Sequence, residues 1–542
     1  MPRWLNEAKS KGRIYFFNIY EALNYCHLIF KLVNGNYKIT HIPYENEKMP
    51  DKDLEKRHLD TLDRDLGRLS SPDRSTSYAS RPFISFGISL IFIILAGLVA
   101  LYLFGNSSNT VVIVIAAGFG AYMALNIGAN DVANNMGPAV GANALTMGGA
   151  IAIAAIFESA GALLAGGDVV STIAKGIIAP ESMQTASIFV WAMLAALLSA
   201  ALWVNLATWI GAPVSTTHSV VGGVMGAGIA AAGFAAVNWP TMYKIAASWV
   251  ISPVLGGAVA ALFLWFIKSR IIYQADKIAA ARRWVPVLVG IMGGTFAAYL
   301  ALKGLKKIMK IEFSSALTIG LGIGIIIWLT MIPVIRKQSE GLENRNKSLK
   351  ILFGIPLVVS AALLSFAHGA NDVANAVGPL AAIVQATSTG GFMDAISIPI
   401  WVMGIGALGI SFGLFLFGPK LIRMVGGQIT KLNPMRAYCV ALSAAITVIV
   451  ASWLGLPVSS THIAVGGVFG VGFFREWDAQ RRIKAARLTI PEANDQPKEE
   501  RQRRKLVRRS HFLTIIAAWI ITVPAAAVLS AIIFFMINIF MS

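Results

Sequence analysis

Two nearly identical polar motifs stand in strongly apolar sequence, and their residue types suit the binding of a cation. GANDVANNMGP begins at Gly128 and GANDVANAVGP begins at Gly369, 241 residues later, with nine of eleven positions identical. Even on a lenient scale, an aspartate at the centre of a bilayer costs about 2.5 kcal/mol. Asp131 and Asp372 must therefore face protein, water or a cation rather than lipid.

The asparagines of both motifs add neutral amide oxygens beside the carboxylates. Asn130 and Asn134 are four residues apart, so a helix places them on one face. The glycines and the proline of each motif weaken regular helix and free backbone carbonyls. Such oxygens suit Na⁺, and a protonatable aspartate suits H⁺ equally well. The predicted coupling-cation residues are Asp131, Asn134, Asp372 and Asn375, and a Na⁺ ion is expected among Asn130, Asp131, Asn371 and Asp372.

A second pair of motifs places hydroxyl side chains directly after a proline. PVSTTH begins at Pro213 and PVSSTH begins at Pro457, 244 residues later. Proline is favoured in the first turn of a helix, and a helix N-terminus binds anions through free N–H groups and its dipole. We expect each motif to open a short helix in a re-entrant hairpin, with the chain reversing at the glycine-rich stretches 222–228 and 466–472.

Two such hairpins, facing each other, suit a small tetrahedral oxyanion, because hydroxyl groups and helix N-termini both donate hydrogen bonds to it. The predicted anion ligands are Ser215, Thr216, Thr217, Ser459, Ser460 and Thr461, together with Asn130 and Asn371.

A further carboxylate, Glu158, lies inside the apolar segment AIAAIFESAGALLAGG. The residue at the same offset in the second half is Pro399, and the nearest acid, Asp394, is five residues too early. We expect Glu158 to join the coupling-cation residues or to form an ion pair, because an unpaired carboxylate is costly inside a membrane.

The elements that position these motifs are predicted to be transmembrane helices. The chain of 542 residues is 56% hydrophobic and only 13% charged, against about 25% charged in soluble proteins. Apolar runs such as 82–104, 243–267 and 512–541 are long enough to span a bilayer, which takes about 20 residues. A β-barrel would show short alternating segments instead. We predict an all-α polytopic membrane protein with about 11–13 membrane segments.

Two independent motif pairs at nearly the same offset indicate that the chain is duplicated. Duplicated halves with polar motifs at matching places are typical of secondary transporters, whose substrates bind near the midplane between broken helices. Duplication of a purely structural bundle would preserve apolar packing rather than these polar residues. The predicted organisation is an N-terminal cytosolic extension (1–81), an extra span (82–109), a first repeat (110–267), basic loops with two linking spans (268–350), and a second repeat (351–542) with a basic cytosolic loop (475–510).

The formal net charge of +19 comes from basic residues that cluster in the polar segments between spans. The positive-inside tendency places these segments in the cytoplasm, so the charge does not predict nucleic-acid binding. The two cysteines, Cys26 and Cys439, are too few and too distant for a disulfide framework or a metal cluster. Residues 1–81 show no pattern of a signal peptide. We expect a multi-pass protein of the plasma membrane, which is the inner membrane of a bacterium.

The duplicated GANDVAN-x-x-GP and PVS[ST]TH motifs resemble those of the inorganic phosphate transporter (PiT) family, which also includes sulfate permeases. The resemblance runs from about Val111 to the C-terminus. It implies two inverted repeats and import of inorganic phosphate by symport with Na⁺ or H⁺. It also implies alternating access around a midplane site and no cofactor besides the coupling ion. It assigns substrate and cation binding to Asn130, Asp131, Asn134, Asn371, Asp372, Asn375 and the Ser/Thr residues of both hairpins.

Other functions fit these residues less well. An intramembrane enzyme is disfavoured because no G-x-S-x-G elbow is present and a nucleophile has no reason to occur in both halves. Channel filters usually come from symmetric subunits rather than from two diverged halves with acidic pairs. Sulfate transport by the same fold stays open as the alternative to phosphate, and a homodimer stays open as the assembly.

Overall fold

The computed structural model describes residues 72–541 apart from 108, 211–213, 305–311, 390–397, 425–431 and 490–508. Both pairs of motifs belong to one compact unit, Ser80–Ser542. Up to residue 71, the predicted N-terminal extension lies outside the described residues.

The described unit is helical almost throughout, which confirms the all-α prediction. Eleven of the described helices are long and apolar enough to cross a bilayer, in agreement with the predicted number of segments. The longer helices are α4 (Pro72–Phe104), α5 (Thr110–Asn130), α6 (Val132–Gly141), α7 (Met147–Ala165), α9 (Ala186–Ile210), α10 (Thr216–Ala232), α11 (Trp239–Ile267), α12 (Lys277–Lys303), α13 (Phe313–Gln338), α15 (Gly354–Thr389), α16 (Ile400–Met424), α17 (Pro434–Trp453), α18 (Ser460–Thr489) and α20 (Arg509–Met541).

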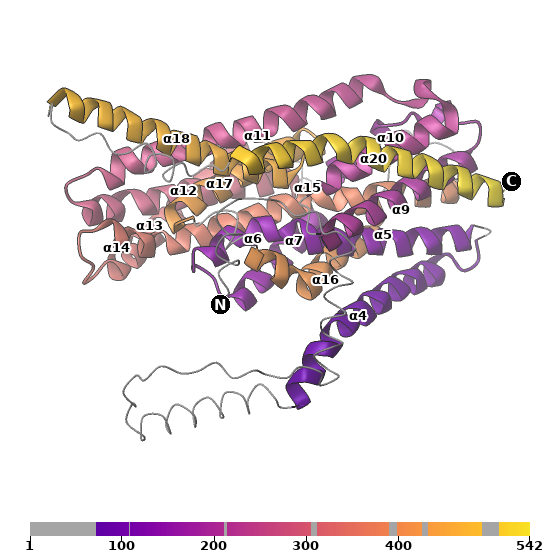
Figure 1. Cartoon of the computed structure of the whole chain (residues 1–542), viewed down its shortest axis with the longest axis horizontal. Helices are drawn as coiled ribbons and strands as arrows, with labels where there is room; N and C mark the ends of the chain where they lie inside the picture. The colour runs from indigo at the N-terminus through magenta and orange to yellow at the C-terminus, as the bar shows by residue number, and fades with distance from the viewer. Residues whose placement is uncertain are drawn as a thin grey trace, which may run out of the picture. The chain divides into compact units, whose positions relative to one another are not determined.

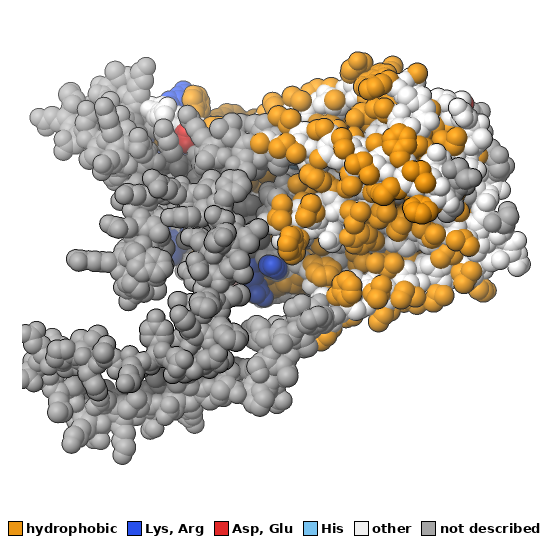
Figure 2. Space-filling view, turned by 45° about the vertical axis from the view of Figure 1, so that its right-hand side comes forward, with side chains coloured by type: hydrophobic (Ala, Val, Ile, Leu, Met, Phe, Trp, Pro, Cys, Tyr) orange, Lys and Arg blue, Asp and Glu red, His pale blue; other side chains and the backbone are white. Residues whose placement is uncertain are grey.

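The outer surface of this bundle is apolar. Figure 2 shows hydrophobic side chains covering most of the described face, with little charge among them. Leu321 and Ile326 on α13, and Val254 on α11, are each more than 60% exposed. Soluble monomers rarely expose contiguous apolar patches of this kind, so this surface is the one that contacts lipid.

Helices of one half pack against helices of the other at matching positions. A Cβ atom added at Gly128 on α5 would overlap the carbonyl oxygen of Ile410 on α16, and one added at Gly369 on α15 would overlap that of Glu158 on α7. Small residues permit such close approach between membrane helices. The same contact therefore occurs in both halves, as expected for two interlocked repeats.

The prediction that the chain reverses at the glycine-rich stretches is wrong. The helix α10 runs unbroken from Thr216 to Ala232, and α18 runs for 30 residues from Ser460, so both stretches lie inside helices. The second copy reverses before its hydroxyls, near Gly455, whose φ is 67°. We call α9 with α10, and α17 with α18, the two hairpins, and the hydroxyl-bearing starts of α10 and α18 their tips. The two helices leave the middle of the bundle in opposite directions (Figure 1), which is the arrangement expected of inverted repeats.

The glycines serve helix packing instead of a turn. A Cβ atom at Gly226 would overlap the backbone of Ala527 on α20, and one at Gly470 would overlap the backbone of Gly257 on α11. Glycine is compatible with a tight turn and with close helix contact, and here the second use decides the conformation.

The prediction of broken helices is wrong in the second copy, and the first copy shows only a one-residue interruption. The helix α5 ends at Asn130 and α6 begins at Val132, and Asp131 between them keeps right-handed helical backbone angles (φ −85°, ψ −34°). In contrast, α15 continues from Gly354 to Thr389 through Pro379. Membrane helices tolerate an internal proline when neighbouring groups satisfy the freed carbonyl.

Candidate functional site

The four motifs meet in the interior of the bundle, where the N-termini of α10 and α18 approach the α5–α6 junction and the middle of α15. The two aspartates and the six predicted hydroxyl ligands are all at most 3% exposed. The structure therefore brings these sequence-predicted residues together in one buried polar cluster.

Each aspartate accepts a hydrogen bond from the hairpin of its own half. Thr216 Oγ1 donates to Asp131 Oδ2 over 2.6 Å, and Ser460 Oγ donates to Asp372 Oδ2 over 3.3 Å. Thr216 and Ser460 hold the same place in the two PVS[ST]TH motifs. The same carboxylate–hydroxyl contact is thus made twice.

Each of the two later asparagines contacts the hairpin of the opposite half. Asn134 Nδ2 donates to Thr461 Oγ1 over 2.9 Å, and Asn375 Nδ2 donates to Thr217 Oγ1 over 3.1 Å. Thr461 Oγ1 also donates to Asp131 Oδ1 over 3.3 Å. The cluster is therefore shared between the halves, so a relative movement of the halves would break it.

The hairpin helices present their N-termini to this cluster. Ser215 Oγ accepts a hydrogen bond from the backbone N–H of His218 over 3.2 Å, and Ser459 Oγ accepts one from that of His462 over 3.3 Å. These two serines are N-caps. The tips also touch, since Thr217 Oγ1 donates to the carbonyl of Val458 over 3.1 Å. The partial positive charges of two helix ends are thus directed at one buried site.

The first asparagines of the GANDVAN motifs bond to the segments that lead into the hairpins. Asn130 Nδ2 donates to Thr208 Oγ1 near the end of α9, over 2.7 Å. Asn371 Nδ2 donates to Ser452 Oγ over 3.0 Å, and its Oδ1 accepts from the backbone N–H of Val458 over 3.2 Å. These side chains hold the hairpin connections in place rather than contacting the hydroxyl cluster.

Glu158 belongs to a buried polar chain that connects the two halves and is not repeated at the equivalent positions. Glu158 Oε2 lies 2.6 Å from His368 Nδ1, and His368 Nε2 lies 2.7 Å from Asp372 Oδ2. Asn135 Nδ2 donates to Glu158 Oε1 over 2.9 Å. Through His368, the carboxylate of Glu158 is connected to the aspartate of the second motif.

The sequence motifs did not identify His368 or Asn135. Both occupy positions at which the two copies differ, since His368 corresponds to Ile127 and Asn135 corresponds to Ala376. A polar residue that replaces an apolar one in only one copy is the signal that predicts them.

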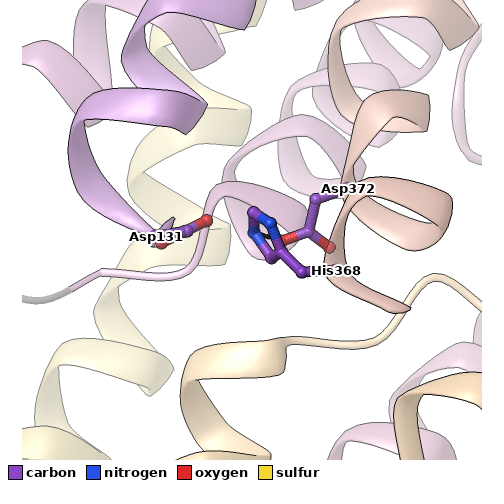
Figure 3. A group of neighbouring side chains, drawn as sticks. All are labelled: Asp131, His368 and Asp372. Atoms are coloured by element: carbon purple, nitrogen blue, oxygen red, sulfur yellow. Dashed lines mark ion pairs between the residues drawn. The ribbon is translucent and has the colours of Figure 1, made fainter. Parts of the chain in front are cut away.

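Asp131, His368 and Asp372 could together hold a metal ion or a proton. One ligand atom from each lies within 4.8 Å of the other two, and all three residues are buried. Figure 3 shows Asp131 at the end of its helix, facing His368 and Asp372, which lie one turn apart on α15. The carboxylates supply negative charge next to the hydrogen-bond donors of the hairpins, so the site offers adjacent places for a cation and an anion.

Comparisons with known proteins identify relatives of this arrangement. Residues 127–530 match the model of the phosphate transporter family. A Helicobacter pylori protein named "Putative phosphate permease" is 45% identical over 516 residues, which cover 85% of this chain and 96% of the relative. A relative from Pyrococcus abyssi is 36% identical over 415 residues, covering 77% and 95%. A solved structure named "The sodium-dependent phosphate transporter" superposes with a TM-score of 0.71 at 34% identity and covers 79% of this chain and 99% of its own.

Proposed function

Because this chain belongs to the phosphate transporter family, we propose that it imports inorganic phosphate by symport with Na⁺, by alternating access around the buried hydroxyl cluster. The observation that supports this best is the repeated contact pattern of that cluster. Each half supplies an aspartate and an asparagine, and the asparagine binds the hairpin of the other half. A site shared by two repeats is typical of secondary transporters that work by alternating access.

The hairpin residues Ser215, Thr216, Thr217, Ser459, Ser460 and Thr461 are the proposed phosphate ligands. They combine hydroxyl donors with the N-termini of two helices, which together satisfy several oxygens of one tetrahedral anion. Asn130 and Asn371 take part by fixing the connections that lead into these hairpins.

Phosphate is preferred to sulfate because of the two aspartates beside the hydroxyls. Protonated phosphate can donate a hydrogen bond to an ionised carboxylate, whereas sulfate carries no proton at neutral pH and is repelled by it. The phosphate permeases among the relatives support the same choice.

Coupling follows from the competition for the hydroxyl groups. Thr216 and Thr461 both donate to Asp131, so these protons are not available to an anion in the same geometry. A Na⁺ ion bound by Asp131, Asn134, Asp372 and Asn375 takes over the negative charge and allows the hydroxyls to turn to phosphate. Na⁺ then raises the affinity for phosphate, and phosphate raises the affinity for Na⁺ by the same factor. The sodium dependence in the name of the solved relative favours Na⁺.

H⁺ is the second candidate for the coupling ion, because His368 bridges two buried carboxylates. Glu158 and Asp372 contact its two ring nitrogens at 2.6 and 2.7 Å. A proton on His368 would offset the charge of Asp372 at Oδ2, the same oxygen that accepts the hydrogen bond from Ser460. The plasma membrane is the proposed location, and its potential and ion gradients would drive either form of symport.

Calorimetry on the purified full-length protein tests the proposal. Phosphate should bind at least about tenfold more tightly in NaCl than in choline chloride at equal ionic strength, which corresponds to a typical coupling energy of 1–3 kcal/mol. Sulfate should bind more weakly than phosphate in both salts. Equal phosphate affinities in the two salts at pH 6 and at pH 8 would remove Na⁺ from the binding step, and a rise at pH 6 alone would assign coupling to H⁺.

A further inference from the structure

A basic cavity is lined by α14 (Asn346–Leu352), the start of α17 and the middle of α18. Figure 1 shows α14 at one end of the bundle. Its volume is about 400 Å³, and Asn433, the N-cap of α17, lies on its wall. Five basic residues from four different segments line it, and none of its described lining residues is acidic: Lys268, Lys347, Lys350, Arg436 and Arg475.

This cavity is separate from the transport site. None of the residues of the four motifs lines it. Arg436 is 16 residues from Ser452, which bonds to Asn371, and both lie on the single helix α17. At 1.5 Å per residue they are about 24 Å apart along the helix axis.

The positive charge of the cavity is only partly neutralised by the protein. Lys268 Nζ forms an ion pair with Asp478 over 2.7 Å. Among the residues that the structure describes, no ion pair is formed by Lys347, Lys350, Arg436 or Arg475. Burial lowers the pKa of Arg475 to about 10, and the like charge of Arg436 contributes to the shift. Two half-buried guanidinium groups that repel each other are expected to be stabilised by an anion.

The residue types favour phosphate oxygens over a single carboxylate. Guanidinium groups present planar pairs of donors that match phosphate, and lysines add mobile point charges. The cavity volume lies within the range of small-molecule pockets and far exceeds that of one water molecule. Basic pockets between helices on the cytoplasmic side of membrane proteins commonly receive the head groups of acidic lipids.

We propose that this cavity is a second anion site, which binds a phosphate group carried by an anionic lipid or present as inorganic phosphate. The two sources share the same recognition chemistry, and they differ in whether the ligand arrives from the bilayer or from solution. A lipid would hold the starts of α14 and α17 at the bilayer surface. Free phosphate would instead occupy the cavity in proportion to its concentration at this end of the protein.

Two variants test the proposal on the purified full-length protein. Lys347→Gln/Lys350→Gln removes two exposed charges and is expected to leave the fold intact, and Arg475→Gln removes one half-buried charge. The control, Arg336→Gln/Lys337→Gln, removes two exposed charges at the end of α13 that do not line the cavity. Binding of ³²P-labelled inorganic phosphate is measured by equilibrium dialysis in sodium-free buffer, and binding of dihexanoyl phosphatidylglycerol by native mass spectrometry.

We expect at least one probe to bind about tenfold more weakly to both cavity variants, because each lost contact to a charged group is worth roughly that factor. The control should bind as the wild-type protein does, and the probe that responds identifies the source of the phosphate group. Asp131→Asn should leave this binding unchanged, which separates it from the transport site. The proposal fails if neither probe loses more than threefold in either variant, or if the control loses as much as they do.

Discussion

Hydroxyl side chains in the buried cluster lie between a carboxylate that accepts their hydrogen bond and an amide that donates one to them. Thr216 donates a hydrogen bond to Asp131 and accepts one from Asn375, so its orientation depends on the charge of the carboxylate. Ser460 makes the corresponding contact with Asp372. At the scale of single residues, the proposed coupling is a change of acceptor, in which these hydroxyls stay protonated and donate their hydrogen bonds to phosphate instead of aspartate.

Truncating the hydroxyls should weaken phosphate binding. Thr216→Ala and Ser460→Ala should each lower the phosphate affinity about 10- to 150-fold, because a hydrogen bond to a charged group is worth roughly 1.5–3 kcal/mol. Calorimetry in NaCl measures this, and Na⁺ binding in phosphate-free buffer should change less. Thr447→Ala is the matched control, since its buried hydroxyl donates to the backbone of Ser443. Unchanged phosphate affinity in both variants and in their double mutant would show that the hydroxyls only pack the tips.

Glu158 and His368 should act as one unit. Glu158→Gln and His368→Gln should each reduce phosphate uptake by about tenfold or more, because either change removes the charge-assisted contact between them. The double mutant should be no slower than the single mutants, since residues in one network are not additive. Uptake into proteoliposomes measures all three. If the two losses multiply in the double mutant, the residues work independently and the chain through His368 has no role in coupling.

Helices α10 and α18 are held by close contact with α20 and α11, and this contact decides how the hairpins sit at the scale of elements. The glycines at these contacts allow backbone to meet backbone, so the positions of the hydroxyls depend on residues far from the motifs. A larger side chain at Gly226 or Gly470 would overlap the backbone of the neighbouring helix, so the two helices would have to move apart.

Gly470→Ala tests this packing directly. The added methyl group would overlap the backbone of Gly257, and overpacking of this kind typically costs about 1–3 kcal/mol. We expect a lower midpoint of thermal unfolding in detergent, measured by loss of the monodisperse chromatographic peak. Gly404→Ala on α16 is the control, because nothing lies within 4 Å of its added Cβ and alanine favours helix. Equal midpoints for wild type and Gly470→Ala would mean that α18 does not depend on this contact.

Sequence patterns alone predicted the helical class, the duplication and the polar residues that form the cluster. The sequence patterns did not predict where the chain turns. Glycine is compatible with both a chain reversal and a close helix contact, and only the tertiary structure distinguishes the two. The comparison of the two copies did not identify His368 or Asn135, because it reveals only the residues that the copies share. Both residues lie at positions where the copies differ. Glu158 has Ile410 as its structural counterpart, which a constant sequence offset could not show.

At the scale of the whole molecule, the described surface that Figure 2 shows combines a broad apolar face with charged side chains toward one end. In Figure 2 the visible Lys and Arg side chains lie toward one end of the described surface, and the broad apolar face is nearly free of them. The positive-inside tendency therefore predicts that the end with α14 faces the cytoplasm. With this orientation, the proposed import of phosphate would run toward the basic end.

Cysteine labelling of intact cells tests this orientation. In a Cys26→Ser background, Arg345→Cys lies at an exposed position next to α14, and Glu181→Cys lies at an exposed position in the loop before α9. An impermeant thiol reagent should label position 181 from outside and position 345 only after permeabilisation. The remaining cysteine, Cys439, is buried and should stay unlabelled. The reverse labelling pattern would invert the topology.

Uptake of ³²P-labelled phosphate into proteoliposomes that contain the purified protein tests the central claim most directly. An inward Na⁺ gradient should drive phosphate above its external concentration, and collapsing that gradient with an ionophore should release it. Asp131→Asn and Asp372→Asn should abolish this accumulation while the proteins still insert, because each removes a carboxylate proposed to bind the cation. An inward pH gradient imposed without Na⁺ identifies proton coupling in its place. If neither gradient produces accumulation, or if both aspartate variants accumulate phosphate as the wild type does, then coupled symport through this site is contradicted.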